Sequence, residues 1–433
     1  MRPFLVWILI TLSFLMAEQN SVAASPQGHW TGMADLNGDK IAMELDFEMN
    51  EEPVTGRWSL PELGYDGIPF QNVKFDPSTS SIAGDKTFIT GTFDEDVVSG
   101  KLVWRRIEAT FQLKRSSMPD LPYLEEQVSF VNGDVKLAGT LVLPRQPRRY
   151  PAIVFLHGSG SATRWGAMYY AVHFAKQGLA TLIYDKRGSG ASGGDWTQSS
   201  LDDLARDGLA AIQYLKSRKE IDAKKIGIWG ISQAGWVASR LCSMTNDVSF
   251  MIMVSGGGVR PHDSEMFSYN TRFKHAAMTD TEKSEATVLL DQYFSYLKTG
   301  EKREALLGAI EAAKQKGWYQ YVSLDRILPS QDGLVHWNWV ARYDPAVDIQ
   351  KIKFPVLLLF GENDTEQPVS LAVKAWEKGL TAAQNKDYRI RIFPEANHGI
   401  RSGSHEGGDQ WPRFVEGYLD MQLKWLAERL NPK

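Results

Sequence analysis

Cysteine is almost absent from this sequence, with Cys242 the only one among 433 residues. A disulfide within the chain is therefore excluded. Cysteines and histidines nowhere fall at the spacing of zinc ligands, so we expect neither a metal nor a cofactor. Cys242 itself falls late in a predicted helix, where a buried packing role is more common than a nucleophilic one.

Positive charge is not in excess either. The formal net charge is −4, from 48 Lys and Arg against 52 Asp and Glu. This balance provides no basic field to hold nucleic acid or an anionic membrane. Hydrophobic residues make up 43 % of the chain and charged residues 23 %, an ordinary globular composition that supports a sizeable core.

The one long apolar run lies at the N-terminus. Arg2 provides a positive charge, residues 4–16 are almost entirely apolar, and 22–24 are small residues before Ser25. We therefore expect residues 1–24 to be a signal peptide cut near Ala24, which predicts a periplasmic or secreted protein. An uncleaved anchor is the alternative, but the run is shorter than the about 20 apolar residues of a bilayer span.

Residues 25–118 have the pattern of an all-β domain. Apolar and polar side chains alternate over 41–49, a period of two that predicts a strand with one buried face. Turn-forming residues separate further predicted strands at 87–93, 101–104 and 109–113. A small sandwich or a partly open barrel is expected. Its role could be binding, dimerisation or shielding.

Residues 119–433 change to short apolar strands alternating with helices. A hairpin is predicted over 126–143, with its turn at 132–134. Near-continuous apolar runs are typical of a parallel sheet covered on both faces, so we predict an α/β domain. The predicted strands of this kind are 152–156, 180–184, 226–229, 250–254, 356–360 and 390–393.

Residues 259–345 interrupt this alternation and are too many for a simple connection. Helical periodicity over 289–297 and 306–313 predicts a helical insertion, with Gly317 as a C-cap. Its aromatic residues suit an apolar acyl or aryl group, and Trp337 and Trp318 are the candidates for substrate binding. Packing of these rings onto the core is the alternative.

A serine in a tight turn is the first candidate for chemistry. Gly230-Ile231-Ser232-Gln233-Ala234-Gly235 follows the strand 226–229 and opens a helix. A sharp strand-to-helix turn crowds the backbone, and small residues two positions before and after the nucleophile relieve the crowding. Gly230 and Ala234 occupy those positions, although Ala234 departs from the usual glycine. We predict Ser232 as the nucleophile, at a helix N-terminus whose N–H groups face the reacting centre.

A second glycine-rich segment, His157-Gly158-Ser159-Gly160, ends the strand 152–156. Glycine lets a backbone N–H approach a substrate closely. We predict that the N–H of Ser159, or of Gly158, forms an oxyanion hole with the N–H of Gln233, and that Gly158 contacts the substrate. His157 could be a second base, but a hydrogen bond that supports the loop is the commoner use.

An acid and a histidine each follow a later predicted strand. Of the eight histidines, only His398 has both a late chain position and a strand immediately before it. Asp364 precedes it at the end of another strand. The order Ser232, Asp364, His398 predicts a catalytic triad. Glu362 and Glu366 are rival acids.

These motifs make residues 123–433 resemble the α/β-hydrolase superfamily, and within it bacterial carboxylesterases and prolyl-oligopeptidase-like hydrolases. Leu137-Ala138-Gly139-Thr140-Leu141, 157–160 and Asp185-Lys186-Arg187-Gly188-Ser189-Gly190 carry the resemblance. It implies an eight-stranded, mostly parallel sheet, the same triad, and a lid or cap formed by 259–345. Residues 25–118 are far too few for the β-propeller of true prolyl oligopeptidases, which counts against a peptidase.

We therefore expect an exported serine hydrolase that cleaves carboxylic esters through an acyl-enzyme on Ser232. A serine exopeptidase or amidase with the same triad is the alternative, and an inactive ligand-binding protein is a further one. Asp185 and Arg187 could meet the substrate, although pairing within their glycine-rich loop is more common. The expected partner is a small-molecule ester, without nucleic acid or a membrane span after signal cleavage; a homodimer stays open.

Overall fold

The computed structural model describes residues 25–49, 54–79, 81–84, 88–146, 148–403 and 408–430. The predicted signal peptide, residues 1–24, lies outside these ranges. Two separate β-sheets organise the described chain. No helix within these ranges is long and apolar enough to cross a membrane.

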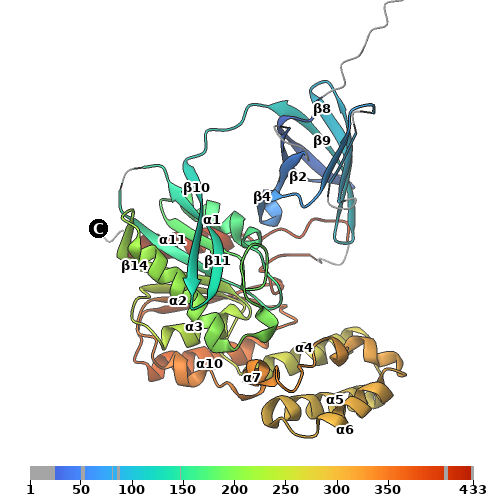
Figure 1. The fold of residues 1–433 in the computed structure, drawn as a ribbon, viewed down its shortest axis with the longest axis vertical. Coiled ribbons are helices and arrows are strands. Elements are labelled where there is room, and N and C mark those ends of the chain that lie inside the picture. Colours follow the sequence, from blue (N-terminus) through green and yellow to red (C-terminus); the bar gives the residue numbers. More distant parts are fainter. Residues whose placement is uncertain are drawn as a thin grey trace, which may run out of the picture.

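The N-terminal sheet is a single antiparallel sheet of nine strands in the order β4-β3-β2-β1-β9-β8-β7-β6-β5. It curves around its own apolar core as a half-barrel, drawn in blue and teal in Figure 1. Of the two expected architectures, the structure therefore shows the partly open barrel and not the sandwich. The strands are β1 (Gly28–Leu36), β2 (Asp39–Glu48), β3 (Thr55–Leu60), β4 (Tyr65–Pro69), β5 (Val73–Asp76), β6 (Ser81–Gly84), β7 (Ile89–Asp94), β8 (Val97–Trp104) and β9 (Ile107–Ser116).

The second sheet has eight strands in the order β10-β11-β13-β12-β14-β15-β16-β17. The strands β12 to β17 are parallel to one another, whereas β10 and β11 form an antiparallel hairpin at one edge and β11 also pairs antiparallel with β13. The predicted α/β architecture is confirmed. The strands are β10 (Tyr123–Asn132), β11 (Val135–Pro144), β12 (Tyr150–Leu156), β13 (Ala180–Tyr184), β14 (Ile221–Ile231), β15 (Phe250–Val254), β16 (Val356–Gly361) and β17 (Tyr388–Phe393).

Helices cover both faces of this second sheet, which explains why β13 and β15 are buried at every position. One face packs against α1 (Met168–Ala175) and α11 (Tyr418–Leu430). The other packs against α2 (Leu201–Ser217), α3 (Ala234–Cys242) and α10 (Val369–Ala382). Cys242 is buried at the end of α3, and burial raises the pKa of its thiol, so its predicted packing role is confirmed.

The cap, residues 259–345, is helical as predicted and has an apolar core of its own. It lies at the end of the molecule opposite the half-barrel (Figure 1). The predicted C-cap at Gly317 is wrong, because α6 already ends at Ala313 with Lys314 as its cap. The helices are α4 (Pro261–His275), α5 (Asp280–Thr299), α6 (Arg303–Ala313), η5 (Gly317–Tyr321), η6 (Leu324–Arg326), α7 (Leu334–Trp337) and α8 (Trp339–Arg342).

A C-terminal segment joins the half-barrel to the rest of the chain. Trp411 is buried in the half-barrel core, and its indole N–H donates to the carbonyl of Asp39 at 2.9 Å. Arg413 donates to both carboxylate oxygens of Asp39, at 2.7 and 2.9 Å, and also bonds Glu62. Residues separated by some 370 positions in the sequence are thereby held together.

Candidate active site

Ser232 lies in the turn between β14 and α3, at the carboxyl end of the parallel strands. Its φ of +60° is in the left-handed region, which is uncommon for a residue with a side chain. The N–H of Ser232 donates to the carbonyl of Val254 at 2.9 Å, which ties the turn to β15. This strained strand–turn–helix geometry is the one that presents a nucleophile at the top of an α/β sheet.

The small residues around Ser232 are needed because of close contacts. A Cβ added to Gly230 would lie 2.4 Å from the Cβ of Ala234. A Cβ on Gly235 would lie 2.3 Å from the backbone nitrogen of Gly257. Both distances are far below van der Waals contact. Ala234 can replace the usual glycine because Gly230 leaves room for its methyl group.

His398 and Asp364 are in direct contact. The Nδ1 atom of His398 lies 2.8 Å from Oδ2 of Asp364. The other oxygen of Asp364 accepts the backbone N–H groups of Glu366 and Gln367, at 2.8 and 2.9 Å. An ionised carboxylate can only accept, so Nδ1 carries the proton and Nε2 is left free to act as a base.

The environment of His398 favours its protonated form. Burial by itself would lower the pKa of His398, but the hydrogen bond and charge of Asp364, with the charge of Glu366, outweigh it and raise the pKa. The two rival acids are otherwise engaged. Glu366 accepts from Ser268 of α4, and Glu362 accepts the N–H of Glu395.

The segment 157–160, called here the oxyanion loop, lies beside Ser232. A Cβ placed on Gly158 would be 3.8 Å from the Cβ of Ser232. Within the loop, Nε2 of His157 lies 2.6 Å from the carbonyl oxygen of Tyr184, and burial lowers the pKa of His157 to about 4. His157 therefore supports the loop from β13 by a hydrogen bond, as expected, and is not placed as a second base.

Asp185 and Arg187 are both buried and paired. Asp185 bonds Arg164 with an N–O distance of 2.8 Å, and Arg187 bonds Asp207 of α2 at 2.7 Å. Their structural role was expected. Both ion-pair partners lie outside the glycine-rich loop, but the carboxylate of Asp185 also accepts the backbone N–H of Ala191, next to Gly190 in that loop, at 2.9 Å.

A pocket of about 520 Å³ lies between the oxyanion loop and the cap. Ser159 and Gln233 line one side of it, and Trp337 of α7 lines the cap side. Trp337 also donates its indole N–H to the carbonyl of Thr197 at 2.6 Å. The substrate-binding prediction for Trp318 is corrected: it packs in the core of the cap and donates to Glu285, away from the lining of this pocket.

Several residues of this region were not predicted from the sequence. Trp196, Trp236, Tyr269 and Phe294 provide further aromatic walls, and they come from four separate segments. Glu265 of α4 is the carboxylate in the lining, and no spacing in the sequence connects it with Ser232.

Burial and the nearby charge of Glu366 raise the pKa of Glu265, while Arg272 opposes this effect. The lining of the pocket thus combines aromatic surface with one carboxyl group, from Glu265, and one guanidinium group, from Arg326.

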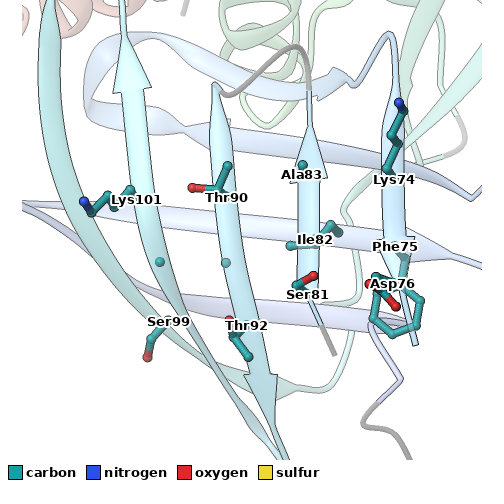
Figure 2. A pocket seen from close by; sticks show the side chains of 12 residues that line it. Lys74, Phe75, Asp76, Ser81, Ile82, Ala83, Thr90, Thr92, Ser99 and Lys101 are labelled. Atoms are coloured by element: carbon teal, nitrogen blue, oxygen red, sulfur yellow. The ribbon is translucent and has the colours of Figure 1, made fainter. Parts of the chain in front are cut away.

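The half-barrel has a shallow groove of about 540 Å³ on its β5–β8 strands (Figure 2). Figure 2 shows Lys74 on β5 and Lys101 on β8, with hydroxyl side chains such as Thr90 and Ser81 on the strands between them. Histidine is missing from the described lining of this groove. Likewise, no group of three potential metal ligands occurs among the described residues.

Comparison with known proteins identifies a family for this chain. The sequence model of the X-Pro dipeptidyl-peptidase (S15) family matches residues 132–394, a segment that contains Ser232 and Asp364 and ends just before His398. The quorum-quenching protein AidA of Acinetobacter baumannii (strain MDR-ZJ06) is 26 % identical over 315 residues, which cover 70 % of this chain and 96 % of AidA.

Two esterases are also similar. Esterase EstD of Thermotoga maritima is 23 % identical over 317 residues, covering 70 % of this chain and 68 % of EstD. The solved structure of the Pyrococcus furiosus esterase Pf2001 has 18 % sequence identity and a TM-score of 0.46, and covers 71 % of this chain and 94 % of its own. Since the family match spans more than half of the sequence, this chain belongs to the X-Pro dipeptidyl-peptidase (S15) family and is a hydrolase.

Proposed function

We propose that this protein is a serine esterase with Ser232 as nucleophile, His398 as general base and Asp364 as its partner. The observation that carries the proposal is the 2.8 Å contact between His398 and Asp364. The strands β14, β16 and β17, which precede Ser232, Asp364 and His398, are parallel, so their carboxyl ends lie on the same side of the sheet. The strained turn at Ser232 supports it independently.

In the proposed mechanism, Oγ of Ser232 attacks the ester carbonyl while Nε2 of His398 takes the hydroxyl proton. The N–H groups of Gln233 and Ser159 stabilise the oxyanion. The imidazolium, stabilised by Asp364, then gives its proton to the leaving alcohol, and an acyl-enzyme remains. Water attacks this acyl-enzyme in a second step, with His398 again taking and returning the proton, and releases the acid.

The substrate class follows from the pocket beside Ser159 and Gln233. Its walls include Trp196, Trp236 and Trp337, which favour an apolar acyl or aryl group. A small-molecule ester with such a group is therefore the proposed substrate.

Substitution of the nucleophile tests the proposal. Ser232→Ala should abolish hydrolysis of p-nitrophenyl butyrate, with a loss of at least about 10⁴-fold in kcat, because the covalent step needs the hydroxyl. Ser243→Ala, in a serine that donates to the carbonyl of Arg240, is the matched control and should keep full activity. Retained activity in the Ser232 variant would reject the mechanism.

A peptidase or amidase with the same triad is the second candidate, and Glu265 is the observation that favours it. A carboxylate between aromatic walls could bind the ammonium group of a peptide N-terminus. Aminoacyl-naphthylamides and p-nitrophenyl esters should be compared in the unaltered protein and in Glu265→Gln. Preference for the esters in both proteins supports the esterase, whereas naphthylamide turnover that Glu265→Gln removes supports the peptidase.

Export is proposed from the pattern of residues 1–24 alone. Expression of the full chain in a bacterium, followed by fractionation and N-terminal sequencing, should give a periplasmic or secreted protein that begins at Ser25. A full-length cytoplasmic product would reject this.

A further inference from the structure

A buried lysine lies directly behind the proposed oxyanion hole. Lys186 follows β13 between the paired residues Asp185 and Arg187, and only 3 % of its surface is exposed. Its backbone N–H donates to the carbonyl of Ala162 at 2.9 Å, which fixes the residue against the chain just after the oxyanion loop. The proposed mechanism gives this lysine no role.

The ammonium group of Lys186 makes three hydrogen bonds. Nζ donates to the carbonyl oxygens of Gly158 and Gly160, at 2.9 and 3.0 Å, and to Oε1 of Gln233 at 2.9 Å. An ammonium group has three donors, so all of them are used. One side chain thus joins the two segments that are proposed to hold the oxyanion.

The bond to Gly158 also sets the direction of the Ser159 N–H. The carbonyl of Gly158 and the N–H of Ser159 belong to one peptide group, which is planar and trans, so they point in opposite directions. Because the carbonyl points at Nζ of Lys186, the N–H points away from it. Donation by a cation to the carbonyl polarises the same amide and makes its N–H a stronger donor.

The charge of Lys186 is not neutralised by a contacting carboxylate. Its three acceptors are neutral, and the neighbouring carboxylates Asp185 and Asp207 are bound to Arg164 and Arg187. In the described part of the chain, no ion pair involves Lys186. A positive charge in a site with little water is costly, and it is best compensated by negative charge that develops nearby during the reaction.

We propose that Lys186 is the positioning residue of the oxyanion hole, holding the oxyanion loop and Gln233 in place and stabilising the oxyanion by its charge. The inference rests on the proposed function, because it assumes that the tetrahedral intermediate forms at Ser232. It assigns a role to a residue that touches the donors and not the substrate.

The buried position of Lys186 also affects its pKa. Burial, only partly opposed by the charge of Asp207, lowers the pKa of Lys186 to about 8. The groups that share a small cavity with Lys186 are His157, Tyr184, Asp207 and Gln233, and the ring of Trp196 lies 5.6 Å away.

These neighbours do not compete in that pH range. Burial lowers the pKa of His157 to about 4 and raises that of Tyr184 well above 10, while Asp207 is held by Arg187. Above pH about 8 the lysine should lose its charge and one of its three donors, and activity should fall.

The test is Lys186→Met, which keeps the length of the side chain and removes its charge and hydrogen bonds. Lys225→Met is the matched control, because Lys225 donates to the carbonyl of Leu430 far from the site. Hydrolysis of p-nitrophenyl butyrate should be followed by pH-stat titration between pH 6 and 10, with circular dichroism to confirm folding. Inhibition by an alkyl trifluoromethyl ketone, which forms a tetrahedral oxyanion with the nucleophile, should be measured on the same proteins.

We expect Lys186→Met to lower kcat by about 10²–10³-fold, as the loss of an oxyanion donor does, with KM changed less than about threefold. Affinity for the trifluoromethyl ketone should fall in parallel. The unaltered protein and Lys225→Met should lose activity above pH about 8, whereas Lys186→Met should show no such loss.

Full kcat and full ketone affinity in Lys186→Met would overturn the inference. If that variant fails to fold, the pH profile of the unaltered protein tests the inference instead. A rate of ester hydrolysis that stays constant from pH 7 to 10 would equally overturn the proposed role of Lys186. The parallel Ser232→Ala protein separates the two proposals: if it stays active the proposed function fails, whereas an inactive Ser232→Ala beside a fully active Lys186→Met rejects the role of Lys186 alone.

Discussion

At the scale of single residues, the site depends on small side chains around a strained serine. Ser232 adopts a left-handed backbone conformation, and the methyl of Ala234 fills the space that Gly230 leaves free. The two positions are therefore coupled: one of them can carry a methyl group, and both cannot. The departure at Ala234 from the usual glycine leaves the turn intact.

This coupling predicts the effect of Gly230→Ala. Its new methyl would meet that of Ala234, shift the turn and lower kcat for ester hydrolysis by about 10²-fold, as small displacements of a nucleophile do. Adding Ala234→Gly should restore most of the activity, and Ala234→Gly alone should be close to the unaltered protein. Steady-state kinetics of the three variants check this, and undiminished activity in Gly230→Ala would contradict it.

At the scale of elements, much of the hydrolase sheet could be predicted because each buried parallel strand is a short apolar run. The strands at 180–184 and 250–254 match β13 and β15 residue for residue. The position of Asp364 and His398 after two such strands was enough to predict their contact, which the structure shows at 2.8 Å.

Contacts between distant segments could not be predicted in this way. Lys186 belongs to a motif that the sequence does show, yet its bonds to Gly158, Gly160 and Gln233 depend on the packing of three loops. For the same reason Trp337 and Trp318 look alike in sequence and have different surroundings in the cap. The presence of a tryptophan in a sequence does not show which way its ring points in the fold.

The two tryptophans should therefore respond differently to substitution. Trp337→Ala removes a wall of the pocket and should raise KM for p-nitrophenyl butyrate by about tenfold, with little change in thermal stability. Trp318→Ala leaves a cavity in the cap and should lower the unfolding free energy of the cap by about 3–5 kcal/mol. Kinetics and urea unfolding of both proteins test this, and a higher KM confined to Trp318→Ala would contradict the assignment.

At the scale of the whole molecule, the half-barrel is held to the hydrolase part by the segment that contains Trp411 and Arg413. The alternating pattern of residues 25–118 predicts an all-β domain, but nothing in it indicates that a residue some 370 positions later completes the core of that domain. The choice between sandwich and barrel likewise depends on pairing between strands that are distant in sequence.

Trp411→Ala should consequently destabilise the half-barrel while leaving the site intact. Loss of this buried ring should cost about 3–5 kcal/mol of unfolding free energy, because it opens a cavity in the half-barrel core. We expect earlier urea unfolding and faster trypsin cleavage within residues 25–118, with unchanged kcat. Arg389→Ala, at an exposed ion pair with Glu428, is the control. If Trp411→Ala unfolds at the same urea concentration as the unaltered protein, the proposed contribution of Trp411 to the half-barrel core is contradicted.

The central claim, that Ser232 is the nucleophile, is tested most directly by a fluorophosphonate that reacts covalently with activated serines. After labelling, digestion and mass spectrometry should locate a single adduct on the peptide that contains Ser232, and labelling should disappear in Ser232→Ala. An adduct on another serine, or an unlabelled protein that still hydrolyses p-nitrophenyl butyrate, would contradict the account.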